Sequence, residues 1–278
     1  MASTASGSRG TCLIRVWIDW RGKNQLLRLC YPVALSAPTF RYEIPYGSME
    51  RLADGREWPG QRWVLVSGTD GYNLALANDA KYSYAAYGNS LYVTALRSPV
   101  YAHHDPYTLG PGGTYPYTDQ GEQVFTLRLW AGQGLSPLDA FHLADELTRP
   151  PVATPHVSRV GQGPQHASLL PIEARSSVAT WLKATEDGAG LIVRVLEANG
   201  KPDTVVLPTS GDQRAAPGRG ERSPKGWAEA TEGSGVPRPK AGERSASPAG
   251  RHALAPYGLA TLRMDQDGRW RLSDGLES

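Results

Sequence analysis

The chain has 278 residues and a formal net charge of +2, with 29 Lys and Arg against 27 Asp and Glu. This length allows one or two domains with a buried core, and the small charge gives no electrostatic reason to expect nucleic acid or a membrane as partner. Glycine (31) and proline (22) are abundant while long helical patterns are scarce, which favours an all-β chain with many turns.

The N-terminal residues 1–10 are small and polar, and they are predicted to be disordered. They lack the apolar core of a signal peptide, and no segment approaches the roughly 20 apolar residues that a membrane span needs. A soluble, cytoplasmic protein is therefore expected. In that compartment Cys12 and Cys30 should be buried free thiols, and a disulfide between their neighbouring strands is the alternative.

Short strand patterns recur at nearly regular spacing through the first half of the chain. Strands are expected at 13–18, 25–31, 39–44, 63–67, 72–77, 90–96 and 123–130. The first two are predicted to pair as a hairpin around a turn at 21–24. This series predicts a large antiparallel β-sandwich over residues 11–134.

Residues 135–169 are predicted to contain one helix and a linker. Ser136 can cap the helix, Pro137 suits its first position, and Pro150-Pro151 should end it near residue 149.

A smaller C-terminal β-sandwich is predicted over residues 170–278. Its strands are expected at 178–183 and 190–196, with a last hairpin formed by 259–263 and 269–271. Residues 209–251 contain almost no large aliphatic side chains and cannot bury enough surface to offset chain entropy, so they are predicted to form a disordered insert.

Several motifs in the first sandwich occur in a familiar order. They are Glu43-Ile-Pro-Tyr-Gly47, Gln61-Arg-Trp63, Asn78-Asp79, Leu96-Arg-Ser-Pro99 and Asp119-Gln-Gly-Glu-Gln-Val-Phe125. In this order the chain resembles the C-terminal β-sandwich region of glycoside hydrolase family 38 α-mannosidases. The resemblance covers most of 12–134, and more weakly 168–200 and 254–278. It implies a galactose-mutarotase-like supersandwich for the large domain.

The resemblance also carries expectations about chemistry. It implies retaining hydrolysis of α-mannosides, in mannose metabolism, by a zinc-bearing barrel that lies N-terminal to this region in the family. No counterpart of the catalytic acids or zinc ligands is recognised between Met1 and Ser278. We therefore expect this chain alone to be inactive, without a cofactor of its own, and to have the catalytic barrel and a mannose-containing glycan as partners. A stand-alone carbohydrate-binding module and one subunit of a split α-mannosidase are the alternatives.

A substrate rim is the role that the resemblance suggests for a few residues. Arg97 corresponds to an arginine that approaches the substrate in distant family members, and the following loop brings His103, His104 and Asp105. Adjacent residues of a strand point to opposite faces, so these two histidines do not predict a metal site, and a hydrogen-bonded loop is the simpler interpretation.

Aromatic and acidic residues suggest two further hypotheses. Trp58 and Tyr46 are candidates for stacking on a sugar, whereas Trp17 and Trp63 are expected in the core. Asp119 and Glu122 could form a catalytic pair, but they are expected instead to shape a turn by accepting backbone N–H bonds.

Overall fold

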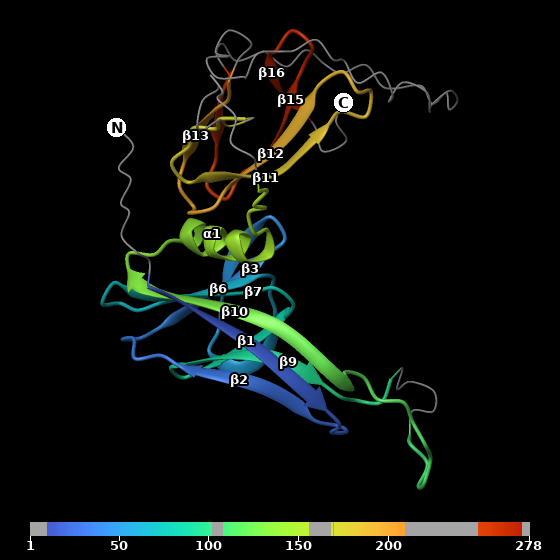
Figure 1. Ribbon diagram of the computed structural model, residues 1–278. Helices are drawn as coiled ribbons and strands as arrows, with labels where there is room; N and C mark the ends of the chain where they lie inside the picture. Colours follow the sequence, from blue (N-terminus) through green and yellow to red (C-terminus); the bar gives the residue numbers. More distant parts are fainter. Residues whose placement is uncertain (1–9, 102–107, 156–167, 169, 209–249, 274–278) are drawn as a thin grey trace. The chain divides into compact units, whose positions relative to one another are not determined.

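The computed structural model describes residues 10–101, 108–155, 168, 170–208 and 250–273. The chain divides into two compact units, Met1–Ala153 and Thr154–Ser278. Figure 1 shows the strands of each unit and the helix α1.

The first unit consists of two antiparallel sheets. The larger has six strands in the order β1-β10-β7-β6-β3-β4, and the smaller has four in the order β2-β9-β8-β5. The strands are β1 (Thr11–Trp20), β2 (Leu26–Pro32), β3 (Thr39–Ile44), β4 (Gly47–Arg51), β5 (Asp54–Pro59), β6 (Trp63–Ser67), β7 (Tyr72–Asn78), β8 (Ser83–Tyr87), β9 (Ser90–Arg97) and β10 (Gly121–Gln133).

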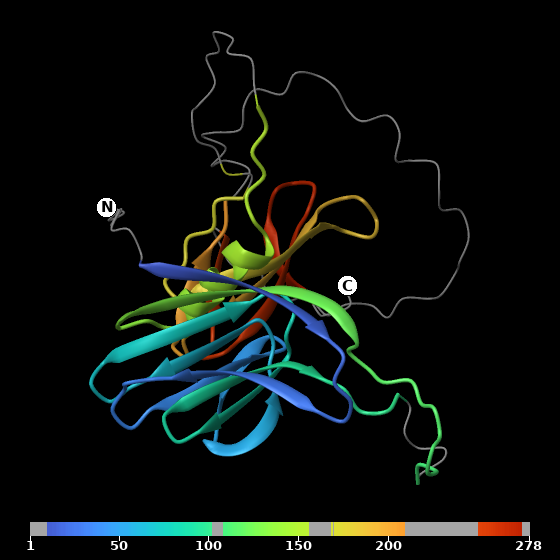
Figure 2. The same ribbon diagram turned by 60° about the horizontal axis from the view of Figure 1, so that its bottom comes forward.

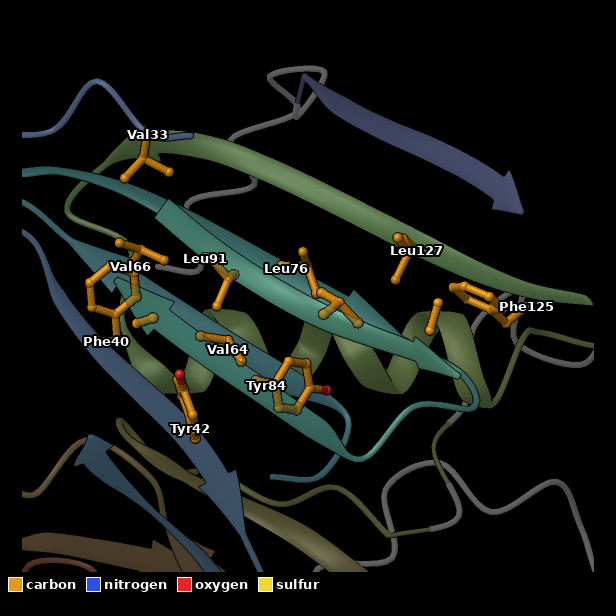
Figure 3. Close-up of a cluster of buried hydrophobic side chains, with 13 residues drawn as sticks. Val33, Phe40, Tyr42, Val64, Val66, Leu76, Tyr84, Leu91, Phe125 and Leu127 are labelled. Atoms are coloured by element: carbon orange, nitrogen blue, oxygen red, sulfur yellow. The ribbon is translucent and has the colours of Figure 1, made fainter. Parts of the chain in front are cut away.

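The core of the first unit lies between these two sheets (Figure 3). The larger sheet contributes Val64 and Val66 from β6, and the smaller contributes Tyr84 and Leu91 from β8 and β9. All four are fully buried, and each buried aliphatic side chain contributes about 1.5–3 kcal/mol. The predicted all-β sandwich is confirmed.

Helix α1 (Pro137–Thr148) covers the other face of the six-stranded sheet. Ala140 and Leu143 of the helix pack with Trp63 of β6 and Ala75 of β7, so β6 is buried on both faces. Ser136 caps the helix in a capping box, and Pro137 stands at its start, which confirms the predicted helix.

The second unit contains a four-stranded antiparallel sheet in the order β11-β12-β15-β16 and a two-stranded sheet, β13-β14. The strands are β11 (Ser177–Ala184), β12 (Leu191–Glu197), β13 (Asp203–Val206), β14 (Arg251–Leu254), β15 (Leu259–Met264) and β16 (Trp270–Ser273). Val193, Val205, Leu262 and Trp270 join both sheets in one apolar cluster. The pairing of β15 with β16 confirms the predicted last hairpin, and β11 and β12, which form where two strands were predicted, pair antiparallel as well.

The predicted hairpin of the first two strands is wrong. β1 pairs with β10 and β2 pairs with β9, so the short connection between β1 and β2 passes from one sheet to the other.

Cys12 and Cys30 are free thiols, as expected, but both are exposed rather than buried. Cys30 alternates with Leu29 and Tyr31, which pack on the core, so it lies on the outer face of β2, and Cys12 lies near the beginning of the edge strand β1.

The two tryptophans predicted in the core differ in their outcome. Trp63 is 2% exposed, which confirms the prediction, whereas Trp17 is 61% exposed and the prediction is wrong. Trp17 alternates with Val16 and Ile18, which pack on the core, so its ring points away from the core.

Most of the predicted insert, 209–249, lies outside the described residues, and Arg251 begins β14 opposite Val206.

Candidate functional site

A hollow of about 610 Å³ lies on the four-stranded sheet of the first unit, and we call it the Arg97 hollow. Its lining residues come from all four strands of that sheet and from the segments next to β2 and β9. They are Asn24, Gln25, Leu26, Glu57, Ser83, Thr94, Arg97 and Pro99. Thr94 alternates with the buried Val93 and Ala95, so the hollow lies on the face of the sheet that is turned away from the core.

Glu57 of β5 organises the polar part of this hollow. The Ser83 hydroxyl donates a hydrogen bond to Glu57 Oε2 at 2.7 Å, and the Thr94 hydroxyl donates to the same oxygen at 2.5 Å. The Arg28 guanidinium donates to Oε1 at 3.3 Å and lies 4.8 Å from the centre of the Tyr92 ring. One carboxylate therefore joins polar side chains from all four strands of the sheet.

Two irregularities of strand pairing lie next to the hollow. The register shifts between Asp54 and Glu57 on β5, and again between Leu27 and Arg28 on β2. Such bulges redirect the side chains next to them and are frequent beside functional sites.

The backbone of Arg97 is fixed by the segment that precedes β10. Its N–H donates to Asp119 Oδ2 at 3.0 Å, and its carbonyl accepts a hydrogen bond from the Thr118 hydroxyl at 2.8 Å. The side chain is exposed, and within the described part of the chain no hydrogen-bond or ion-pair partner holds its guanidinium. Asp119 thus accepts a backbone N–H bond, as predicted for a turn acid. Its φ of 49° lies in the left-handed region.

This residue set suits a hydroxyl-rich ligand. Guanidinium and amide groups donate hydrogen bonds, hydroxyls both donate and accept, and the half-exposed Leu26 offers apolar contact beside them. Glu57 is the only carboxylate among the lining residues named above, and it already accepts three hydrogen bonds. The hollow therefore suits binding better than the two-acid chemistry of a glycosidase.

The other predicted site residues lie elsewhere. Trp58 is half-buried, packs against the core and has the Arg51 guanidinium 4.8 Å from its ring centre. Tyr46 is 50% exposed in the turn between β3 and β4, where its φ is 53°. Neither ring lines the hollow. His103, His104 and Asp105 lie outside the described residues.

Sequence reasoning missed Glu57, Ser83 and Thr94. They are far apart along the chain, and single polar residues at alternate strand positions are typical of any solvent-facing sheet surface. Only the sheet order brings them together.

The described residues offer neither a metal-ligand cluster nor a membrane-spanning helix. No group of three or more His, Cys, Asp or Glu side chains there could hold a metal ion. The single helix found in those ranges is too short and too polar to cross a bilayer.

The sequence of this chain is similar to parts of known proteins. Residues 10–107 match the family model of the glycosyl hydrolases family 38 C-terminal domain. Alpha-mannosidase G of Dictyostelium discoideum is 24% identical in an alignment of 209 residues that covers 69% of this chain and 18% of that protein. Alpha-mannosidase 2C1 of Mus musculus is 26% identical in an alignment of 206 residues that also covers 69% of this chain and 18% of that protein. The match thus spans less than a fifth of these relatives.

A solved structure has the same fold. The crystal structure of an alpha-mannosidase from Enterococcus faecalis V583 superposes with a TM-score of 0.58 at 18% identity, covering 72% of this chain and 24% of that chain.

Proposed function

We propose, on the premise that residues 10–107 belong to the glycosyl hydrolases family 38 C-terminal domain, that this chain is the supporting portion of an α-mannosidase. In that role it braces a catalytic barrel carried elsewhere and contributes the Arg97 hollow to the rim of the glycan site. The zinc implied by the family belongs to the barrel in this proposal. The free, exposed thiols of Cys12 and Cys30 support a cytoplasmic location.

The observation that carries the proposal is the side chain of Arg97. A guanidinium with no partner among the described residues stands beside hydroxyl and amide groups, inside the region that matches the family model. A charge-assisted hydrogen bond from such a group contributes about 1.5–3 kcal/mol. If it forms with a substrate hydroxyl in the transition state, its loss lowers turnover by about tenfold to a hundredfold.

A reconstitution experiment tests both parts of this role. The chain is mixed with the catalytic part of Alpha-mannosidase 2C1 that lacks the region matched here, and hydrolysis of an aryl α-mannoside is followed with zinc present. We expect turnover to require the chain and to fall at least about tenfold with Arg97→Ala. The control Arg56→Ala removes an arginine whose side chain is 76% exposed and which does not line the hollow.

The outcomes separate the two parts. Turnover that the chain does not increase contradicts the supporting role, and full turnover with Arg97→Ala contradicts the rim role alone. The isolated chain is expected to hydrolyse nothing. Binding of mannose by the isolated chain, lost with Arg97→Ala, would instead favour a stand-alone carbohydrate-binding module.

A further inference from the structure

Strand β1 is the outermost strand of the six-stranded sheet. It pairs with β10 along its whole length, Thr11 to Trp20, and the described residues provide no backbone hydrogen-bond partner for its other side. In Figure 2, β1 (dark blue) lies beside β10 (light green) at the margin of the sheet. An edge strand of this length leaves a row of N–H and C=O groups that can pair with another strand.

The solvent-facing side of β1 is apolar at its centre. Leu13 and Trp17 are 65% and 61% exposed, and Val124, directly opposite Trp17 on β10, is 48% exposed. Exposed apolar side chains grouped on one face are typical of an interaction surface. An occupant of this surface should therefore bury the Trp17 ring and pair with the free edge of β1.

Opposite charges flank this apolar centre. Arg15 lies two residues before Trp17 and Asp19 two residues after it, so all three share one face. Asp19 faces Glu122 across the β1–β10 pair, whereas Arg15 faces the uncharged Thr126. Arg21 lies 2.8 Å from Asp19, but its side chain is 74% exposed, so solvent screens this ion pair and it contributes little. One end of the face is thus acidic and the other basic.

We propose that two copies of this chain associate through the free edges of their β1 strands, paired antiparallel with Trp17 opposite the partner's Trp17. This two-fold register places Arg15 opposite the partner's Asp19, and the symmetry makes that contact twice. Such a surface is complementary to itself, which is what a symmetric dimer requires.

Neighbouring registers are less favourable. Sliding one strand by two residues in either direction keeps the same faces together but sets Asp19 opposite Leu13 or opposite Trp17. Both cross-strand ion pairs are then lost, and a charge lies against an apolar side chain. The charge pattern therefore favours one register over its neighbours.

Sedimentation velocity of the full chain over a series of concentrations tests this proposal. We expect a reversible dimer, and a fall of about tenfold in its association constant with either Arg15→Asp or Asp19→Arg, because each places like charges opposite each other twice. The double variant R15D/D19R exchanges the charges and should restore association. Arg269→Asp, at an 80% exposed position of the second unit, is the matched control and should leave association unchanged.

The double variant distinguishes this register from general loss of folding, because two substitutions that only unfolded the chain would not restore the dimer when they are combined. A wild-type chain that stays monomeric at every concentration overturns the proposal, as does a double variant no better than the singles. The proposal is also overturned if the chain alone is monomeric and binding to the α-mannosidase catalytic part requires Arg15. In that case this face of β1 binds the catalytic part and not a second copy of the chain. None of these outcomes depends on mannoside turnover.

Discussion

The two units hold their buried acids by different means. In the first unit Glu43 is 4% exposed and is paired with a cation, since Arg62 Nη2 lies 2.7 Å from Glu43 Oε1. The same guanidinium reaches Asp145 of α1 at 3.1 Å and stacks 4.8 Å from the Phe141 ring centre. This ion-pair network therefore fastens the helix to the sheet.

In the second unit a buried acid is held by backbone N–H groups instead. Glu197 is fully buried and accepts hydrogen bonds from the N–H groups of Asn199, Gly200, Lys201 and Tyr257 at 2.7–3.1 Å. It therefore fixes the turn after β12 and joins it to the segment before β15.

Asp203 repeats this arrangement at the start of β13. Its Oδ2 accepts from the Ser176 N–H at 2.9 Å and from the Ser177 hydroxyl at 2.7 Å. In the first unit a half-buried cation thus connects distant elements, while buried carboxylates determine the shape of turns in the second. Removal of the Arg62 cation should therefore destabilise the first unit, and removal of the Glu197 charge should destabilise the second.

The largest expected effect comes from Arg62→Ala in the first unit. The substitution leaves Glu43 buried without its cation and releases Asp145, and it should lower the free energy of unfolding by about 3 kcal/mol. Urea unfolding followed by circular dichroism measures the loss. Arg56→Ala, which removes an exposed pair with Asp54, should cost less than about 0.5 kcal/mol. Equal losses of unfolding free energy in the two variants would show that the Arg62–Glu43 ion pair stabilises the fold no more than an exposed pair does.

A smaller effect is expected from Glu197→Gln in the second unit. The amide keeps one acceptor oxygen but loses the charge that four N–H groups share, so we expect a loss of about 2 kcal/mol. Hydrogen exchange of β12 and β15 measures the loss locally, and protection in α1 should not change. Glu173→Gln makes the same chemical change at an exposed position and should have little effect.

Acid should weaken the second unit through these two carboxylates. Burial raises the pKa of Glu197 and of Asp203, but hydrogen bonds from N–H and hydroxyl donors outweigh it, and both pKa values lie below their ordinary values. A carboxylate whose pKa is lower in the folded state stabilises that state at pH values above its unfolded-state pKa of about 4. This stabilisation is lost as the pH falls through the folded-state pKa.

Hydrogen exchange of the second unit in mild acid measures this loss. The double variant E197Q/D203N lacks both titrating groups, so its protection should change less between neutral and acid pH than that of the wild type. An equally steep loss in the double variant would assign the acid sensitivity to other groups.

Sequence patterns predicted local structure well and strand partners poorly. Ser136 and Pro137 mark the start of α1 because capping depends only on adjacent residues. The connection between β1 and β2 was misassigned because a short polar segment can close a hairpin or cross between sheets, and alternation does not distinguish them. Trp17 is exposed because it lies on the side of β1 opposite Val16 and Ile18, and alternation alone does not tell which side of a strand faces the core.

The candidate site shows the same limit. Arg97 could be found because a motif surrounds it, and the structure places it among the residues that line the hollow. Glu57, Ser83 and Thr94 belong to three strands, and their hydrogen bonds exist because β5, β8 and β9 are consecutive in the sheet. Long-range pairing of this kind has no local sequence signal.

The smallest expected effect tests whether the second unit also relies on a cation. Arg263 lies 2.6 Å from Asp187 and 3.4 Å from Asp265, but the Asp187 side chain is 40% exposed. Arg263→Met keeps much of the side-chain volume and should cost only about 0.5–1 kcal/mol at low salt, less at high salt because exposed ion pairs are screened. Urea unfolding at two salt concentrations measures both values, with Glu197→Gln as the comparison, whose buried hydrogen bonds should respond little to salt. A loss for Arg263→Met that matches Glu197→Gln and does not respond to salt would mean that a cation matters as much here as Arg62 does in the first unit.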